Sequence, residues 1–263
     1  KLDQHRLLQG YAAQNGITFF STPEDHNMVE LLDELNVPAF KIASLDIVYF
    51  DLIEAVASKG RPVILSTGMS YLGEIEKALL VLEKKEIKDV VLLHCTSNYP
   101  PQYEDINLRA MNTLSHCFNV PVGYSDHTLG VGVSIAAVAL GACVIERHFT
   151  LDKELPGPDQ RLSMLPHEFK LMADEIRNIE KALGNSTKQP VAAEMEMRRL
   201  HRRRLIATRD LQSGAHLTRG DIACKCSEFG LEPELLSFLI GKKLRRKLIK
   251  DVPFTFDDVC SDA

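Results

Sequence analysis

The sequence lacks a long hydrophobic run, a visible signal peptide and an excess of positive charge. No apolar stretch of its 263 residues approaches the ~20 residues that cross a bilayer, which excludes a helical membrane span. The formal net charge is −5, so the chain has no general basic surface for nucleic acid. We therefore expect a cytoplasmic globular protein with neither a membrane nor a nucleic-acid partner.

Paired cysteine motifs are lacking as well. Cys95 and Cys143 lie inside predicted strands, and Cys224 and Cys226 are too close together for an ordinary zinc pair. The six scattered cysteines predict reduced thiols, which fits a cytosolic protein. A local cluster of arginines at 198–204 is typical of a solvated helix or linker face.

Short apolar runs recur along residues 17–148, and each ends in a polar or Gly/Pro-rich turn. The ends, taken at 22, 44, 67, 96, 126 and 148, have the spacing of a βα repeat. Between them, apolar residues at helical spacing predict helices. The predicted strands are 17–20, 39–42, 63–65, 90–93, 120–122 and 143–145, and the predicted helices are 24–35, 51–58, 71–84, 130–140 and 166–183.

Six parallel βα units favour either a doubly wound sheet or a (β/α)₈ TIM barrel. A barrel normally needs about 250 residues, whereas the six units end near residue 183. The chain opens at Lys1 within a helix-like stretch, residues 2–14. We therefore expect an α/β protein whose residues 1–184 form a TIM barrel without its first two strands, and we expect this chain alone to be inactive.

The pattern changes after Gly184. Residues 185–201 contain Pro190 and are typical of a linker. From 202 to 263, short strands and tight turns predict a small, mostly β domain, which is near the lower size limit for independent stability. We expect this domain to gain burial by docking elsewhere.

Two histidines mark the ends of neighbouring predicted strands. His127 closes the segment 123–127, and His148 closes the segment 146–148. The small apolar helix between them makes a βα crossover, so the two strands should be parallel neighbours. Since α/β folds place their chemistry at the carboxyl ends of strands, two imidazoles there can hold a divalent metal. Two unrelated polar strand ends are an equal alternative on spacing alone.

Hydroxyl groups and one lysine end the other predicted strands. Lysine supplies a point charge and serine or threonine supplies hydrogen-bond donors, which together suit a phosphate dianion. Each residue alone is more often structural, but every strand end contributes one. The set comprises Thr22, Lys41, Ser44, Ser66, Thr67, Ser97, Tyr99, Ser125, His127, Glu146 and His148, with Asp159 from the loop 156–159.

Read in order, these motifs resemble the sialic acid (N-acetylneuraminate) synthase family. The resemblance covers nearly the whole chain, and from about Arg202 onward it extends to the family's antifreeze-protein-like (SAF) domain. The motifs that carry it are Phe20-Ser21-Thr22-Pro23, Phe40-Lys41-Ile42-Ala43-Ser44, Leu65-Ser66-Thr67-Gly68-Met69, Leu93-His94-Cys95-Thr96-Ser97, Tyr99-Pro100, Gly123-Tyr124-Ser125-Asp126-His127-Thr128, Glu146-Arg147-His148-Phe149-Thr150 and Gly157-Pro158-Asp159.

The resemblance implies a transferase that condenses phosphoenolpyruvate with an N-acetylated hexosamine to a nine-carbon 2-keto sugar acid and phosphate. The sugar would be N-acetylmannosamine, its 6-phosphate or a relative, and the assembly a domain-swapped homodimer. The resemblance implies that His127 and His148 bind Mn²⁺ or Mg²⁺. It implies that Thr22, Lys41, Ser66 and Ser125 bind phosphoenolpyruvate, that Glu146 and Asp159 orient sugar hydroxyls or handle protons, that Tyr99 lines the sugar pocket and that Ser97 binds substrate. Arg203 or, next, Arg202 of the partner subunit would contact the N-acetyl group.

This chain departs from the family pattern at two positions. Asp46 stands where the family commonly has Glu, and Ser97 where many members have Asn. The family's first two strands, which carry a catalytic Glu and a second Lys, have no counterpart here. Two other hypotheses remain: a Schiff-base aldolase with Lys41 as the nucleophile, which leaves the histidines unexplained, and a non-catalytic sugar-binding remnant.

Overall fold

The computed structural model describes residues 2–260, and the chain divides into two compact units, Lys1–Asn185 and Ser186–Ala263. Each of the six cysteines is a free thiol, as the sequence predicted. Among the described helices, none combines the length and the apolar character that crossing a membrane requires.

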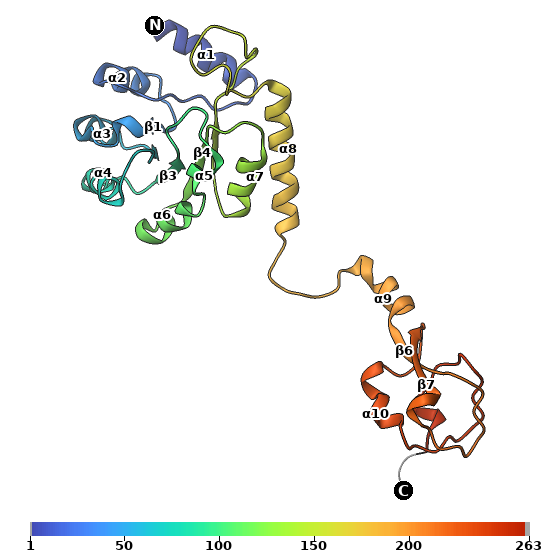
Figure 1. The fold of residues 1–263 in the computed structure, drawn as a ribbon. Coiled ribbons are helices and arrows are strands. Elements are labelled where there is room, and N and C mark those ends of the chain that lie inside the picture. The colour runs from blue at the N-terminus through green and yellow to red at the C-terminus, as the bar shows by residue number, and fades with distance from the viewer. Residues whose placement is uncertain (1, 261–263) are drawn as a thin grey trace. The chain divides into compact units, whose positions relative to one another are not determined.

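The first unit is built on a curled sheet of five parallel strands in the order β1-β2-β3-β4-β5 (Figure 1). Because sequential strands pair with one another, every connection is a crossover, and helices cover the outer face of the sheet. The result is a half-barrel. Its strands are β1 (Phe40–Ile42), β2 (Val63–Ser66), β3 (Val90–Cys95), β4 (Val122–Asp126) and β5 (Ile145–Arg147).

The five predicted helices and the helix-like stretch 2–14 fall close to their predicted ranges, whereas the helices Tyr103–Ile106 and Ala110–Phe118 were not predicted. Asp25 caps α2, since its side chain accepts a hydrogen bond from Met28 N at 2.8 Å. The apolar stripes pack onto the sheet, and the core between the two layers includes Leu32, Ile53 and Leu82. The helices are α1 (Leu2–Gln14), α2 (His26–Glu34), α3 (Phe50–Ala57), α4 (Leu72–Lys84), α5 (Tyr103–Ile106), α6 (Ala110–Phe118), α7 (Gly132–Ala139) and α8 (Pro166–Leu183), with a 3-10 turn at Ser44–Asp46.

The strand predicted at 17–20 is wrong. In the described part of the chain these residues join no sheet ladder. Ile17 N donates to Ala12 O, which closes the end of α1, and Ile17 and Phe20 are 64% and 39% exposed. An apolar run becomes a strand only where a neighbouring strand pairs with it. The six predicted strands are therefore five in the structure.

The second unit has its own small core. Strand β6 (Arg203–Ala207) pairs antiparallel with β7 (Ile222–Cys226), and isolated bridges link further extended segments. Leu205, Leu239 and Phe254 are fully buried at its centre. A 3-10 turn at Ala192–Glu194 and helix α9 (Met195–His201) lie within the stretch predicted as a linker, and α10 (Leu236–Leu239) follows β7.

Candidate active site

A cavity of about 300 Å³ opens at the carboxyl ends of the five parallel strands. This is the edge where α/β folds gather functional side chains. Most of the residues selected from the sequence line this one cavity. The lining residues are Lys41, Ala43, Ser44, Leu45, Ser66, Met69, Cys95, Ser97, Tyr99, Ser125, His127, Glu146 and His148.

Lys41 is the buried cation of the cavity. Only 7% of the residue is exposed, and its Nζ donates to Ser66 Oγ at 2.7 Å. The same Nζ lies 3.4 Å from Glu146 Oε2. Because β1 and β5 are the two edge strands of the sheet, the contact between Lys41 and Glu146 spans the concave face of the curled sheet. The lysine charge is thus held at the centre of the strand ends, where it can meet an anion.

Ser125 and Glu146 form a second polar contact in the cavity. They are partners in the β4–β5 register, and Ser125 Oγ donates to Glu146 Oε1 at 2.6 Å. The Glu146 side chain is 41% exposed, so one of its edges faces the open cavity. It therefore bridges a buried hydroxyl and a buried ammonium while staying accessible to a substrate.

The rings of the two histidines lie next to each other in an edge-to-face arrangement. The ring centroids of His127 and His148 are 5.2 Å apart, and the ring of Tyr99 lies 4.3 Å and 5.9 Å from them. His127 Nδ1 lies 3.1 Å from Thr96 O. A carbonyl can only accept, so this nitrogen carries the proton and Nε2 is left with its lone pair.

Two imidazoles next to each other are a ligand set that a divalent ion accepts. Burial lowers the pKa of His127, and a charged His148 would lower it further, which keeps the neutral form that a metal requires. The carbonyl of Thr96 orients the ring from behind, as outer partners of metal ligands do. Since no group of three or more His, Cys, Asp or Glu with metal-site geometry occurs in residues 2–260, the other ligands would come from substrate or water.

Five selected residues lie apart from the cavity lining: Thr22, Thr67, Asp159, Arg202 and Arg203. Thr67 Oγ1 donates to Leu93 O at 3.0 Å, and Thr67 lines a neighbouring cavity instead. Asp159 is next to the site, with Oδ2 3.7 Å from His148 Nδ1. Thr22 follows the segment that forms no strand and does not line the cavity. Arg203 belongs to the second unit, where it lines a basic cavity of about 680 Å³ together with Lys188 and Arg198.

Ser44 joins the cavity lining through a short 3-10 turn that the sequence did not predict. Its Oγ lies 3.2 Å from Cys95 Sγ and accepts from Gly68 N at 3.0 Å. A Cβ atom at position 68 would lie 2.3 Å from Ser97 Oγ, so only glycine allows this packing. The motif Leu65–Met69 signalled a turn, but the close approach comes from strands that are far apart in sequence.

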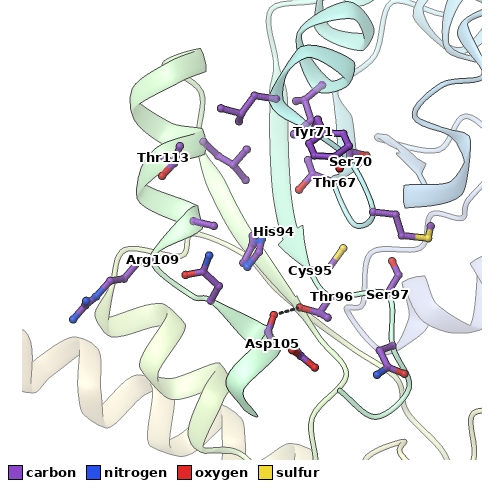
Figure 2. Close-up of a pocket in the computed structure, with 17 residues that line it drawn as sticks. Thr67, Ser70, Tyr71, His94, Cys95, Thr96, Ser97, Asp105, Arg109 and Thr113 are labelled. Atoms are coloured by element: carbon purple, nitrogen blue, oxygen red, sulfur yellow. Dashed lines mark hydrogen bonds between the residues drawn. The ribbon is translucent and has the colours of Figure 1, made fainter. Parts of the chain in front are cut away.

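A larger cavity of about 850 Å³ lies between α4 and α6, beside β3 (Figure 2). Met69, Cys95 and Ser97 line both cavities. His94 Nε2 lies 2.8 Å from Ile106 O, and burial lowers the pKa of this histidine. His94 thus secures α5 and takes no part in the histidine pair.

Comparison with known proteins identifies the family. A model of the NeuB family matches residues 1–188. The chain is 48% identical over 255 residues to an uncharacterised protein of Methanocaldococcus jannaschii, with 97% of this chain and 76% of that protein covered. It is 42% identical over 243 residues to the N,N'-diacetyllegionaminic acid synthase of Campylobacter jejuni, with 92% and 73% covered.

A solved structure shares the fold. The N-acetylneuraminic acid (sialic acid) synthetase of Leptospira borgpetersenii, determined in complex with citrate, superposes with a TM-score of 0.70 at 40% identity. The match covers 75% of this chain and 69% of that chain. Motifs, fold and relatives agree, and the chain belongs to the NeuB family of sialic acid synthases.

Proposed function

We propose that this protein condenses phosphoenolpyruvate with an N-acetylated hexosamine to form a nine-carbon 2-keto sugar acid and phosphate. The observation that carries the proposal is the cavity itself, in which one buried lysine, several hydroxyls and two neighbouring histidines meet in a chain of the NeuB family. The sugar is N-acetylmannosamine, its 6-phosphate or a related amino sugar. We place the reaction in the cytoplasm, in keeping with the free thiols.

Phosphoenolpyruvate takes the half of the cavity around Lys41. The ammonium group meets the phosphate or carboxylate, and the hydroxyl of Ser66, which accepts from Lys41, donates to one of the remaining oxygens. The hydroxyl of Ser125 turns from Glu146 to donate to another. Thr22 closes this side if its loop moves toward the cavity. Bringing C3 of phosphoenolpyruvate near the sugar aldehyde is the main contribution of this half.

The amino sugar takes the half around the histidines. His127 and His148 hold Mn²⁺ or Mg²⁺, which when bound polarises the sugar aldehyde as a Lewis acid. The Tyr99 ring contacts both imidazoles, tilted against His127 and edge-on to His148, and lines the sugar side with Ser97. C3 of phosphoenolpyruvate bonds to the aldehyde carbon, water adds at C2, and the C–O bond to phosphate breaks. Glu146, and Asp159 from its loop, orient hydroxyls and move the protons.

The proposed reaction is tested by phosphate release. The purified protein, expressed from its complete gene, is supplied with phosphoenolpyruvate, Mn²⁺ and a panel of N-acetylated hexosamines and their 6-phosphates. We expect phosphate and a 2-keto acid in equal amounts, and loss of both after metal is removed with a chelator. Phosphate release in the absence of a sugar would contradict the proposal. So would the absence of phosphate release with every sugar of the panel.

We also propose that the half-barrel is part of a (β/α)₈ barrel, and that the second unit is a SAF domain which completes the partner's site in a homodimer. Arg203 begins β6 with its side chain exposed, as a residue that reaches into another subunit must be.

Complementation tests the swapped dimer. His127→Ala and Arg203→Ala variants, each weak alone, are unfolded and refolded together. In a swapped symmetric dimer each mixed pair contains one intact site, so activity should return to about a quarter of the wild-type value. If the activity of the mixture equals only the sum of the activities of the two variants, Arg203 acts within its own chain or has no role in the site.

A further inference from the structure

The backbone ladder that joins β4 to β5 ends just before the histidines. Its last register pair is Asp126 with Arg147. His127 and His148 each come one residue later, beyond the ladder. Backbone hydrogen bonds therefore do not set the distance between the two imidazoles directly.

The two sides of these strands carry different chemistry. Side chains alternate along a strand, so Ser125, His127, Glu146 and His148 face the cavity. Asp126 and Arg147 do not line the cavity, and their side chains are 0% and 2% exposed. A buried ion pair thus lies directly behind the candidate site.

Arg147 of β5 contacts the residues on both sides of His127, Asp126 and Thr128. Its Nη1 lies 2.7 Å from Asp126 Oδ2, and its Nη2 donates to Thr128 O at 2.8 Å. Asp126 also accepts from Thr128 N at 2.9 Å and from Ser134 Oγ at 2.6 Å. The residues before and after His127 are therefore both fixed to the residue that precedes His148.

We propose that Arg147 is a positioning residue that sets the spacing of His127 and His148 through its bridge to Asp126 and Thr128. This inference rests on the proposed metal-binding role of the two histidines. The planar guanidinium holds Nη1 in an ion pair with Asp126 and Nη2 as a donor to Thr128 O, so one side chain contacts both flanks of His127 at once. A lysine ammonium presents its donors from one nitrogen, so it does not reproduce contacts made by two separate nitrogens.

Arg147→Lys tests the proposal, because it keeps the charge and removes the second contact. Mn²⁺ affinity is measured without substrate, by titration followed by electron paramagnetic resonance, at a temperature where circular dichroism shows every variant folded. We expect the Kd for Mn²⁺ to rise about tenfold, the lower end of what loss of an outer partner of a metal ligand costs. The ratio of kcat with Mn²⁺ to kcat with Mg²⁺ should change as well.

Arg61→Lys is the matched control. Arg61 pairs with Asp33 and its Nη1 donates to Val37 O at 2.9 Å, so it also joins a carboxylate and a carbonyl. It precedes β2, at the amino end of the strand, away from the cavity. Its lysine variant should lose stability and keep the wild-type Kd for Mn²⁺.

A second variant, Asp126→Asn with Arg147→Met, covers the case in which Arg147→Lys does not fold. The asparagine oxygen still accepts from Thr128 N, its amide nitrogen donates to Ser134 Oγ, and no buried charge is left. Such replacements of buried pairs are often neutral for stability. It should fold and bind Mn²⁺ weakly. A wild-type Kd in either folded variant overturns the positioning role. A wild-type protein that binds no Mn²⁺ would instead overturn the metal site of the proposed function.

Discussion

Replacing His127 or His148 by alanine should reduce turnover about a thousandfold or more while the protein stays folded. A Lewis-acid metal stabilises a transition state by several kcal/mol, and each 1.36 kcal/mol is a factor of ten in rate. The fold should survive, because side chains at the catalytic ends of strands serve function more than stability. Phosphate release and Mn²⁺ titration on the purified variants measure both effects.

His94→Ala is the matched control for this prediction. His94 is also a strand-end histidine of the same sheet and is partly buried, but it contacts Ile106 O on the other side of β3. It should keep the wild-type Kd for Mn²⁺. Near-normal turnover and metal dependence in His127→Ala or His148→Ala would show that the histidine pair is not the metal site.

Lys41→Met should lower kcat/KM for phosphoenolpyruvate about 100-fold and raise its KM far more than the KM for the sugar. Removing one partner of a buried, hydrogen-bonded charge pair costs about 2–5 kcal/mol, and methionine fills the space of the lysine stem without its charge. Glu146, which now lies 3.4 Å from the ammonium, would be left facing the anionic substrate. kcat should fall too, since the substrate loses its anchor.

Lys59→Met is the control for Lys41. Lys59 is a largely buried lysine paired with Glu30 and Asp33, outside the cavity, and its loss should leave both KM values unchanged. Borohydride treatment with substrate present distinguishes the competing aldolase hypothesis. An equal rise in both KM values, or a covalent adduct trapped on Lys41, would contradict the proposed role.

The order of the βα units was predictable from the sequence, because it depends on local periodicity. The helix at 166–183 was predicted from its first-turn proline and its apolar spacing, and the structure begins and ends it at the same residues. The run at 17–20 shows the limit of this reasoning. Its composition favours a strand, yet strand formation needs a paired neighbour, which composition does not provide.

The sequence also placed the histidines, Lys41, Ser66, Ser125 and Glu146 at one edge, since parallel strands bring their carboxyl ends together. It was able to do so because the strands were correctly located to within a few residues. The sequence could not predict contacts between loop residues that are far apart along the chain, because no periodic pattern relates them. Ser44 against Gly68 is one such contact.

By itself, the sequence therefore determined the repeat, the catalytic edge and the residue types that gather there. Tertiary structure alone decided which side chains touch: the reach of Lys41 across the curl to Glu146, the distance between the imidazoles, and the buried bridge from Arg147 to Asp126 and Thr128. The physical reason is that periodicity fixes the face on which a side chain lies, whereas distances depend on how the sheet curls and on how helices such as α7 pack against it.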